Sequence, residues 1–258
     1  MIKVTIWNEF IHENTQEAAK KMYPGGLHLA IGKGIACDDF SIKYATLEQD
    51  ENHGLSEEVL ADTDVLLWWG HCAHDKVKDE VVDRVMTNVW NGMGLVCLHS
   101  AHMSKVFRRL NGTSGKLIWR EANERERIWC ANPGHPIAQG LPESFVLDYE
   151  EMYGEPFMVA PDAQPIFISW FEGGNVFRSG VTLQRGNGRI FYFRPGHETF
   201  PTYYNANVLK VISNAVLKVI SNAVRWCAPT VRFPDPPTHR PNADEQISPK
   251  VRQTSPEA

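Results

Sequence analysis

The chain has 258 residues, 43% of them hydrophobic and 22% charged, which is an ordinary globular composition and long enough to bury a full core. The formal net charge of -5 excludes the broad basic surface that would neutralise a nucleic-acid backbone, so we expect no nucleic-acid partner. No apolar run approaches the roughly 18 residues needed to span a bilayer, and the first residues lack a signal-peptide pattern. We therefore expect a cytoplasmic protein with no membrane partner.

The first half of the chain alternates strand-like and helix-like segments. Strands are predicted at residues 2–7, 43–47, 64–69 and 94–98, and helices at 15–22, 55–62, 75–91 and 103–110. The third and fourth strands are nearly continuous apolar runs, as expected of strands buried on both faces. This alternation is typical of βαβ units in a parallel sheet with right-handed crossovers.

The second half contains short strand candidates separated by turn residues, at 116–119, 127–131, 145–149, 165–170, 176–183 and 189–194. Gly186-Asn187-Gly188 predicts a hairpin turn before the last of them. These segments should add antiparallel strands to one edge of the sheet.

A helix is predicted from about Asn205, and it contains a tandem duplication in which residues 208–215 are repeated as 216–223. Eight residues are about two turns plus 80°, so the second copy of the apolar stripe is rotated around the helix and only part of it can face the same core. The residues after Trp226 are rich in proline and polar side chains. We expect one α/β domain over residues 1–227 and a tail over 228–258.

Five of the ten histidines closely follow three predicted strands: His71 and His74, His99 and His102, and His197. Open α/β sheets bind ligands beyond the carboxyl ends of their strands, so these side chains should converge on one polar site. Imidazoles beside a carboxylate are ligands that Zn²⁺ prefers. The sequence thus predicts a divalent metal, with zinc favoured, held by His71, His99, His102 and His197.

Other interpretations of the polar residues stay open. A histidine at a strand end is more often a helix cap, a backbone partner or a solvated side chain than a metal ligand. His74 and His102, three residues farther on, can instead point along helices or contact the ligands from behind. The acidic segment 148–155 offers a general base or ligand, although a solvated loop is favoured. Gly32-Lys33-Gly34 lacks either nucleotide-binding spacing, so no nucleotide cofactor is expected.

Five cysteines, Cys37, Cys72, Cys97, Cys130 and Cys227, are widely spaced and include no Cys-x-x-Cys pair. An odd number at such spacing argues against a disulfide framework or a structural zinc knuckle. We expect reduced thiols.

Four motifs together resemble the ThuA (trehalose-utilisation) family in order and spacing, over residues 2–226. They are Trp68-Trp69-Gly70-His71-Cys72-Ala73-His74, Leu98-His99-Ser100-Ala101-His102, Pro133-Gly134-His135-Pro136-Ile137 and Arg194-Pro195-Gly196-His197-Glu198. The resemblance implies a flavodoxin-like three-layer α/β fold related to class I glutamine amidotransferases. It also implies a role in sugar catabolism, including oxidised (keto) disaccharides.

The amidotransferase relationship implies a nucleophile on a strand-to-helix elbow and a histidine after a later strand. His197 matches that histidine, with Glu198 directly after it where the superfamily has a one-residue gap. The elbow has two registers, Ser100 and Cys97, and Ser100 is preferred because Cys97 lies inside an apolar run. Glutaminase activity is not expected.

The sequence favours an enzyme of sugar metabolism that acts on a small carbohydrate or keto-sugar by metal-assisted hydrolase, lyase or isomerase chemistry. Its predicted catalytic residues are Ser100, His197 and Glu198. The alternative is a non-catalytic ligand-binding or assembly protein that kept the fold without the cysteine nucleophile. A third interpretation is a hydrolase dependent on Cys97. A homo-oligomer is left open.

Overall fold

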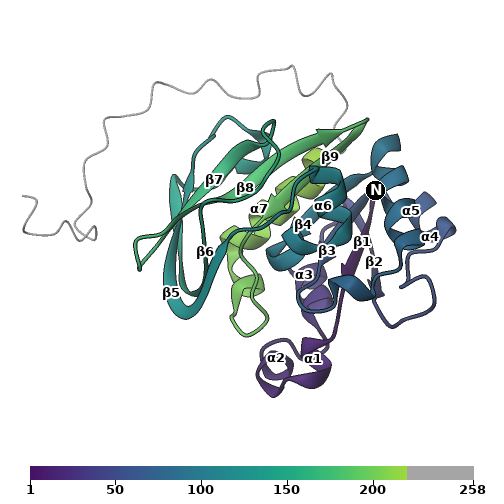
Figure 1. Ribbon diagram of the computed structural model, residues 1–258, viewed down its shortest axis with the longest axis horizontal. Helices are drawn as coiled ribbons and strands as arrows, with labels where there is room; N and C mark the ends of the chain where they lie inside the picture. The colour runs from purple at the N-terminus through teal and green to yellow at the C-terminus, as the bar shows by residue number, and fades with distance from the viewer. Residues whose placement is uncertain (220–258) are drawn as a thin grey trace, which may run out of the picture.

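The computed structural model describes residues 1–219, which form one nine-stranded sheet with helices packed on it (Figure 1). The strands are β1 (Ile2–Asn8), β2 (Phe40–Thr46), β3 (Val65–Trp69), β4 (Gly94–Leu98), β5 (Ile118–Cys130), β6 (Ser144–Gly154), β7 (Gln164–Phe171), β8 (Val176–Arg185) and β9 (Gly188–Phe193). Their order across the sheet is β2-β1-β3-β4-β9-β8-β7-β5-β6.

The first five strands in this order, β2, β1, β3, β4 and β9, are parallel to one another. Every residue of β3 and β4 is buried, as their continuous apolar runs predict. Because β9 pairs with β4 in parallel register, the last strand of the described residues ends at the same edge as β3 and β4. This pairing brings distant sequence segments to one edge.

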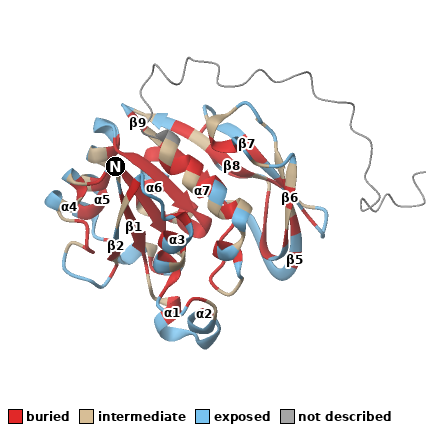
Figure 2. Cartoon of the chain, turned by 180° about the vertical axis from the view of Figure 1, so that it is seen from behind, coloured by how far each residue is buried: buried red, intermediate tan, exposed pale blue. Residues whose placement is uncertain are grey.

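The helices cover both faces of the parallel half. They are α1 (His12–Thr15), α2 (Glu17–Met22), α3 (Leu27–Ile35), α4 (Glu57–Ala61), α5 (Asp79–Asn91), α6 (Lys105–Asn111) and α7 (Ala206–Val219), with short 3-10 turns η1 (His74–Lys76), η2 (His99–Met103), η3 (Pro136–Ala138) and η4 (Thr202–Tyr204). Successive strand residues pack into two different hydrophobic cores, one on each face of the sheet. Leu66 and Cys97 pack with α4, α5 and α6, whereas Leu67 and Val96 pack with α3 and α7. Figure 2 shows buried residues along the sheet and on the inner sides of the helices.

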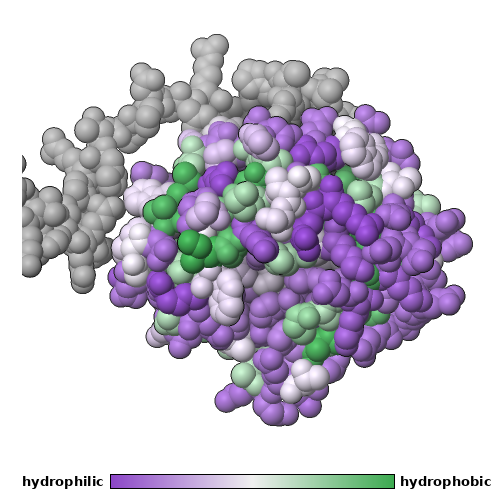
Figure 3. All heavy atoms as spheres, in the orientation of Figure 1, coloured by the Kyte–Doolittle hydropathy of each residue, from purple (hydrophilic) through white to green (hydrophobic). Residues whose placement is uncertain are grey.

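The remaining strands, β8, β7, β5 and β6, are antiparallel to their neighbours and extend one edge of the sheet, as predicted. Figure 3 shows a mostly hydrophilic face with hydrophobic residues gathered where β7 and β8 lie in Figure 1. Ile118, Ile168 and Val176 are among the exposed large hydrophobic residues, and most of that class belong to this half. The antiparallel half therefore leaves more apolar surface in solvent.

The mixed α/β class with parallel and antiparallel parts is confirmed, while the finer flavodoxin-like three-layer assignment stays a prediction. Three parts of the predicted element order were wrong. The helix predicted at 15–22 is two short helices, the strands predicted at 116–119 and 127–131 belong to the single strand β5, and α3 was not predicted. Gly32, Lys33 and Gly34 lie within α3 rather than in a loop.

The duplicated segment begins in α7, where Val208, Val211, Ile212, Ala215 and Val216 are buried. The end of the second copy and the tail predicted at 228–258 lie outside the described residues. Within residues 1–219, no helix has the length and apolar character needed to cross a membrane.

Candidate functional site

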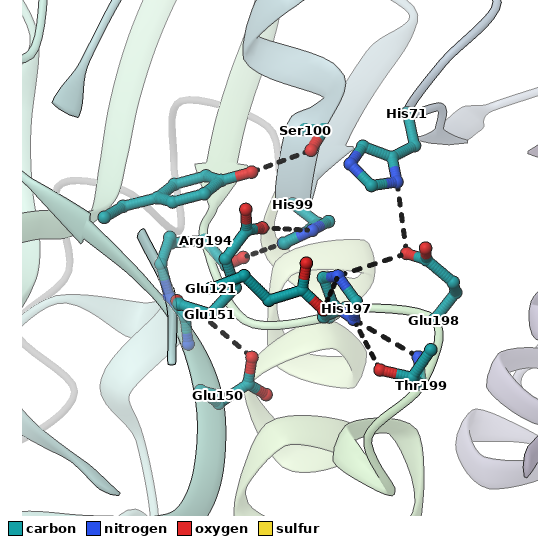
Figure 4. Close-up of polar contacts among 12 residues, drawn as sticks. His71, His99, Ser100, Glu121, Glu150, Glu151, Arg194, His197, Glu198 and Thr199 are labelled. Atoms are coloured by element: carbon teal, nitrogen blue, oxygen red, sulfur yellow. Dashed lines mark hydrogen bonds and ion pairs between the residues drawn. The ribbon is translucent and has the colours of Figure 1, made fainter. Parts of the chain in front are cut away.

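Three histidines meet beyond the carboxyl ends of β3, β4 and β9, as the sequence predicts (Figure 4). The ring centroids of His71 and His99 are 5.5 Å apart, those of His71 and His197 are 5.7 Å apart, and those of His99 and His197 are 5.5 Å apart. The three rings thus form a nearly equilateral triangle.

Each ring of this triangle is oriented through its Nδ1 atom. His99 Nδ1 lies 3.1 Å from the carbonyl oxygen of Arg194, and His197 Nδ1 lies 2.9 Å from the Thr199 hydroxyl. His71 Nδ1 lies 3.1 Å from Glu198 Oε2 in an ion-pair contact whose atoms are not aligned as a hydrogen bond. Contacts of this kind fix ring orientation and leave the Nε2 atoms for another partner.

A buried carboxylate approaches the triangle from β6. Glu151 Oε2 lies 3.2 Å from His99 Nε2, yet the two atoms are not aligned as a hydrogen bond and neither has another hydrogen-bond partner in the described structure. The side chains are 5% and 0% exposed, respectively. Buried polar atoms are nearly always satisfied, so this pair marks a position at which a further group could bind.

The pKa values of the site residues are shifted in different directions by burial and by neighbouring charges. Burial alone would raise the pKa of Glu198, but its contact with His71 holds that pKa well below the usual range. Burial opposes the His71 charge, and Glu198 nevertheless raises the His71 pKa above 6.5. Burial, reinforced by the neighbouring His99 and His71, lowers the pKa of His197 to about 4. At neutral pH His197 is therefore a neutral imidazole beside a His71 that retains its proton more readily.

The strand-to-helix elbow after β4 turns at His99, whose φ of 53° lies in the left-handed region. This residue stands between the two registers weighed above, Cys97 and Ser100. Cys97 is fully buried, and burial raises the pKa of its thiol. The Ser100 hydroxyl hydrogen-bonds the Tyr153 hydroxyl at 2.7 Å. The strained position at the elbow thus carries an imidazole.

A cavity of about 590 Å³ opens over the triangle. It is lined by His71, His74, Ser100, His102, Met103, Lys116, Leu117, Trp119, Glu121, Glu151, Tyr153 and His197. His99 and Glu198 are buried behind this lining at 0% and 3% exposure. The cavity therefore brings the predicted residues after β3, β4 and β9 together with residues of β5, which were not predicted, and with Glu151 and Tyr153 from the acidic segment of β6.

Three side-chain groups in the described residues have ligand atoms within 4.8 Å of one another, as a metal site requires: His71, His99 and Glu151; His12, His71 and Glu198; and Glu9, His12 and Cys72. Among the predicted ligands, His71 and His99 belong to these groups, whereas His102 and His197 do not. His102 lines the cavity and is tethered through Nδ1 to the Gly115 carbonyl at 2.7 Å. Burial lowers its pKa to about 3.

Sequence reasoning missed Glu9, His12 and Tyr153, and it favoured a solvated loop for Glu151. That interpretation was wrong for Glu151, which is 4% exposed on β6. Glu9 and His12 closely follow β1. The strand-end rule that selected the histidines after β3 and β4 would have found them too, had it been applied to β1.

A buried network of ion pairs lies beside the site and contacts the backbone of Glu151. The Arg194 guanidinium, 0% exposed, donates to Glu126, to Glu150 Oε2 at 3.1 Å and to the Glu151 carbonyl at 2.8 Å. Glu150 also accepts from the Thr202 hydroxyl. Arg194 therefore joins the end of β9 to β6, and it fixes the backbone that carries Glu151.

The model of the trehalose-utilisation family, ThuA, matches residues 3–219. The chain belongs to the ThuA family. Among curated proteins, no match was found.

Solved structures share the fold of this ThuA-family chain at low identity. A putative ThuA-like protein from Bacteroides uniformis is 17% identical, with a TM-score of 0.61 over 83% of this chain and 89% of its own. A second, from Parabacteroides merdae, is also 17% identical, with a TM-score of 0.60 over 86% and 92%. A protein from Salmonella typhimurium LT2, described as cytoplasmic, is 11% identical, with a TM-score of 0.60 over 85% and 100%. Family membership points to a sugar-related role.

Proposed function

We propose that this ThuA-family chain is an enzyme that acts on a small carbohydrate or keto-sugar with the help of a divalent metal ion, by hydrolase, lyase or isomerase chemistry. The observation that carries the proposal is the buried pair His99 Nε2 and Glu151 Oε2, 3.2 Å apart and without hydrogen-bond partners in the described structure. Such a pair at the base of a polar cavity is the environment expected of a ligand set.

In this proposal His71, His99 and Glu151 hold the ion. Two imidazoles and one carboxylate leave an open position, which is the pattern of catalytic zinc sites. Bound there, the ion would polarise a carbonyl or hydroxyl oxygen of the substrate. Glu198 orients the His71 ring, and the Arg194 carbonyl orients the His99 ring.

Proton transfer is assigned to the neighbouring residues. His197 is neutral near pH 7 because its pKa is lowered to about 4, and it lines the cavity, so it can accept a proton from the substrate. Glu121 Oε1 lies 3.7 Å from His197 Nε2 and can stabilise the charge that His197 then carries. Ser100 lines the cavity as a hydrogen-bonding group, in place of the nucleophile that its position after β4 predicts.

The function is tested by metal analysis of the full-length protein and by turnover of keto-disaccharides with Zn²⁺ or Mn²⁺ added. We expect Glu151→Gln to lower the metal content by about one ion per chain, and His197→Ala to abolish turnover. His135→Ala is the matched control, because His135 lies in another pocket, and it should keep both. Saturable sugar binding with no product under any metal would instead support the non-catalytic binding protein. A melting temperature unchanged by either ion would remove the metal from the proposal.

A further inference from the structure

A second group of ligand-type side chains lies next to His71, where the segments after β1 and β3 meet, and the His12 and His71 ring centroids are 4.7 Å apart. Glu9 Oε2 accepts a hydrogen bond from the His71 amide at 2.9 Å, and Glu9 Oε1 accepts from the Cys72 amide at 2.9 Å. The Cys72 thiol donates to the same oxygen, with Sγ 3.0 Å from Oε1. Glu9 is 1% exposed, whereas Cys72 is exposed. One carboxylate thus fixes the loop that carries His71, and it also contacts a thiol open to solvent.

His12 completes this group and has no hydrogen-bond partner at either ring nitrogen in the described structure. Its side chain is 9% exposed. A ligand atom of His12 lies within 4.8 Å of ligand atoms of both Glu9 and Cys72. Burying an imidazole with both nitrogens unsatisfied is costly, so the position calls for a partner that can occupy the space between these three side chains.

We propose that Glu9, His12 and Cys72 bind a second divalent ion of the zinc type, at a site that shares no residue with His71, His99 and Glu151. A carboxylate, an imidazole and a thiolate are all zinc ligands, with Zn–S about 2.3 Å and Zn–N or Zn–O about 2.0–2.2 Å. On binding, the Cys72 thiol releases its proton to solvent, and the ion takes the place of that proton between sulfur and Glu9. The exposed thiol gives the ion a path from solvent.

The ion would have a positioning role for the larger site. It would link the loop after β1 to the loop that bears His71, and it would hold His12, whose Nδ1 lies 3.5 Å from Glu198 Oε1. Glu198 in turn contacts His71 Nδ1. In this proposal, an ion bound at the second site would fix the positions of the Glu198 and His71 side chains.

Cobalt(II) titration of the full-length protein tests this inference, because only a cobalt ion bound by a thiolate gives an intense sulfur-to-cobalt charge-transfer band in the near ultraviolet. We expect the band to saturate at one thiolate-bound ion per chain. Cys72→Ser and His12→Ala should abolish it. Cys37→Ser is the matched control, since Cys37 is also a free exposed thiol, and it should keep the full band.

The outcomes separate this inference from the proposed function. A band that is lost in Cys72→Ser but kept in Glu151→Gln supports the second site, whatever happens at His99. Cobalt binding without any sulfur band overturns the second site. An ion held instead by His12, His71 and Glu198 would give this result. A band that survives in Cys72→Ser also overturns the second site. Near-ultraviolet circular dichroism checks that each variant is folded, and Zn²⁺ should slow alkylation of Cys72 at least tenfold while leaving Cys37 unprotected.

Discussion

Replacement of Arg194 by methionine is the most informative change to the support of the site. Arg194, Glu126 and Glu150 are all 0% exposed, and the single guanidinium contacts both carboxylates. Methionine fills a similar volume but leaves the two glutamates without a cation. Breaking a buried ion pair by removing one partner costs about 3–5 kcal/mol, because the remaining charge stays buried.

The two partners of this network should not be equivalent. Burial, together with the charge of Glu150, raises the pKa of Glu126 to about 7 despite its contact with Arg194, so Glu126 is partly protonated at neutral pH. Glu126→Gln therefore removes little charge, and its amide can still accept from Arg194. We expect it to cost about 1 kcal/mol, the range of a single neutral hydrogen bond.

Urea unfolding at pH 7, followed by circular dichroism, measures both variants. A loss of about 3–5 kcal/mol in Arg194→Met corresponds to a melting temperature lower by roughly 6–20 °C in a domain of this size. The double variant should cost less than the sum of the single changes, because the residues are coupled. A loss below about 1 kcal/mol in Arg194→Met, or an equal loss in Glu126→Gln, would refute the assignment of the buried charge.

Three further changes test other features. Lowering the pH from 6.5 toward 4 should destabilise the fold, because the pKa of His197 is about 4 in the native state and 6.5 in the unfolded state. Unfolding then takes up a proton, so stability falls as the pH falls. The urea midpoints at pH 7 and pH 5 measure this change. Gly196→Ala should cost about 1–3 kcal/mol in thermal unfolding, since φ is 140° and a Cβ would overlap the Tyr203 hydroxyl. Cys97 should resist alkylation in the native protein under conditions that label Cys37, as read by mass spectrometry.

Each of these has a clear contrary result. A drop in the urea midpoint from pH 7 to pH 5 that is as large in His197→Gln as in the parent would show that His197 is not buried in its neutral form, because His28, His102 and His135 have lowered pKa values as well. A Gly196→Ala variant as stable as the parent would mean that the turn before His197 relaxes without cost. Labelling of Cys97 as fast as Cys37 would show that β4 opens to solvent.

The parallel half of the fold was predictable because strands buried on both faces consist of continuous apolar residues. The helix α3 was not, since its segment contains Gly32 and Gly34 and looks like a turn. The reason for Gly32 is tertiary: a Cβ there would overlap the Tyr44 ring on β2. Only the packed helix shows why a residue with poor helix propensity stands in its interior.

The long strand β5 was divided in the prediction because its middle residues, from Arg120 to Glu126, are mostly charged. They are compatible with a strand because β5 pairs with β6 and β7, and the buried Glu126 meets a partner there, the Ser169 hydroxyl on β7. Pairing of this kind depends on segments far away in the chain, so local pattern does not reveal it.

The histidines of the candidate site and Glu198 followed from one rule about strand ends, whereas Glu151 did not. Glu151 lies in a strand, and its burial depends on His99 and on the Arg194 network, which come from other strands. Acidic residues are usually exposed, so sequence alone assigns such a residue to the surface. The chemical role of each group, and the bound ion itself, stay predictions.

The place of β9 between β4 and β8 has a consequence for folding. Residues of the site run from His71 in the first third of the described chain to Glu198 near its end, and they meet only when β9 has inserted beside β4. Contacts of such long sequence separation form late and slowly. Any ion or sugar bound there would favour the fully assembled sheet over every partly folded form, and would raise the stability of the whole domain by mass action.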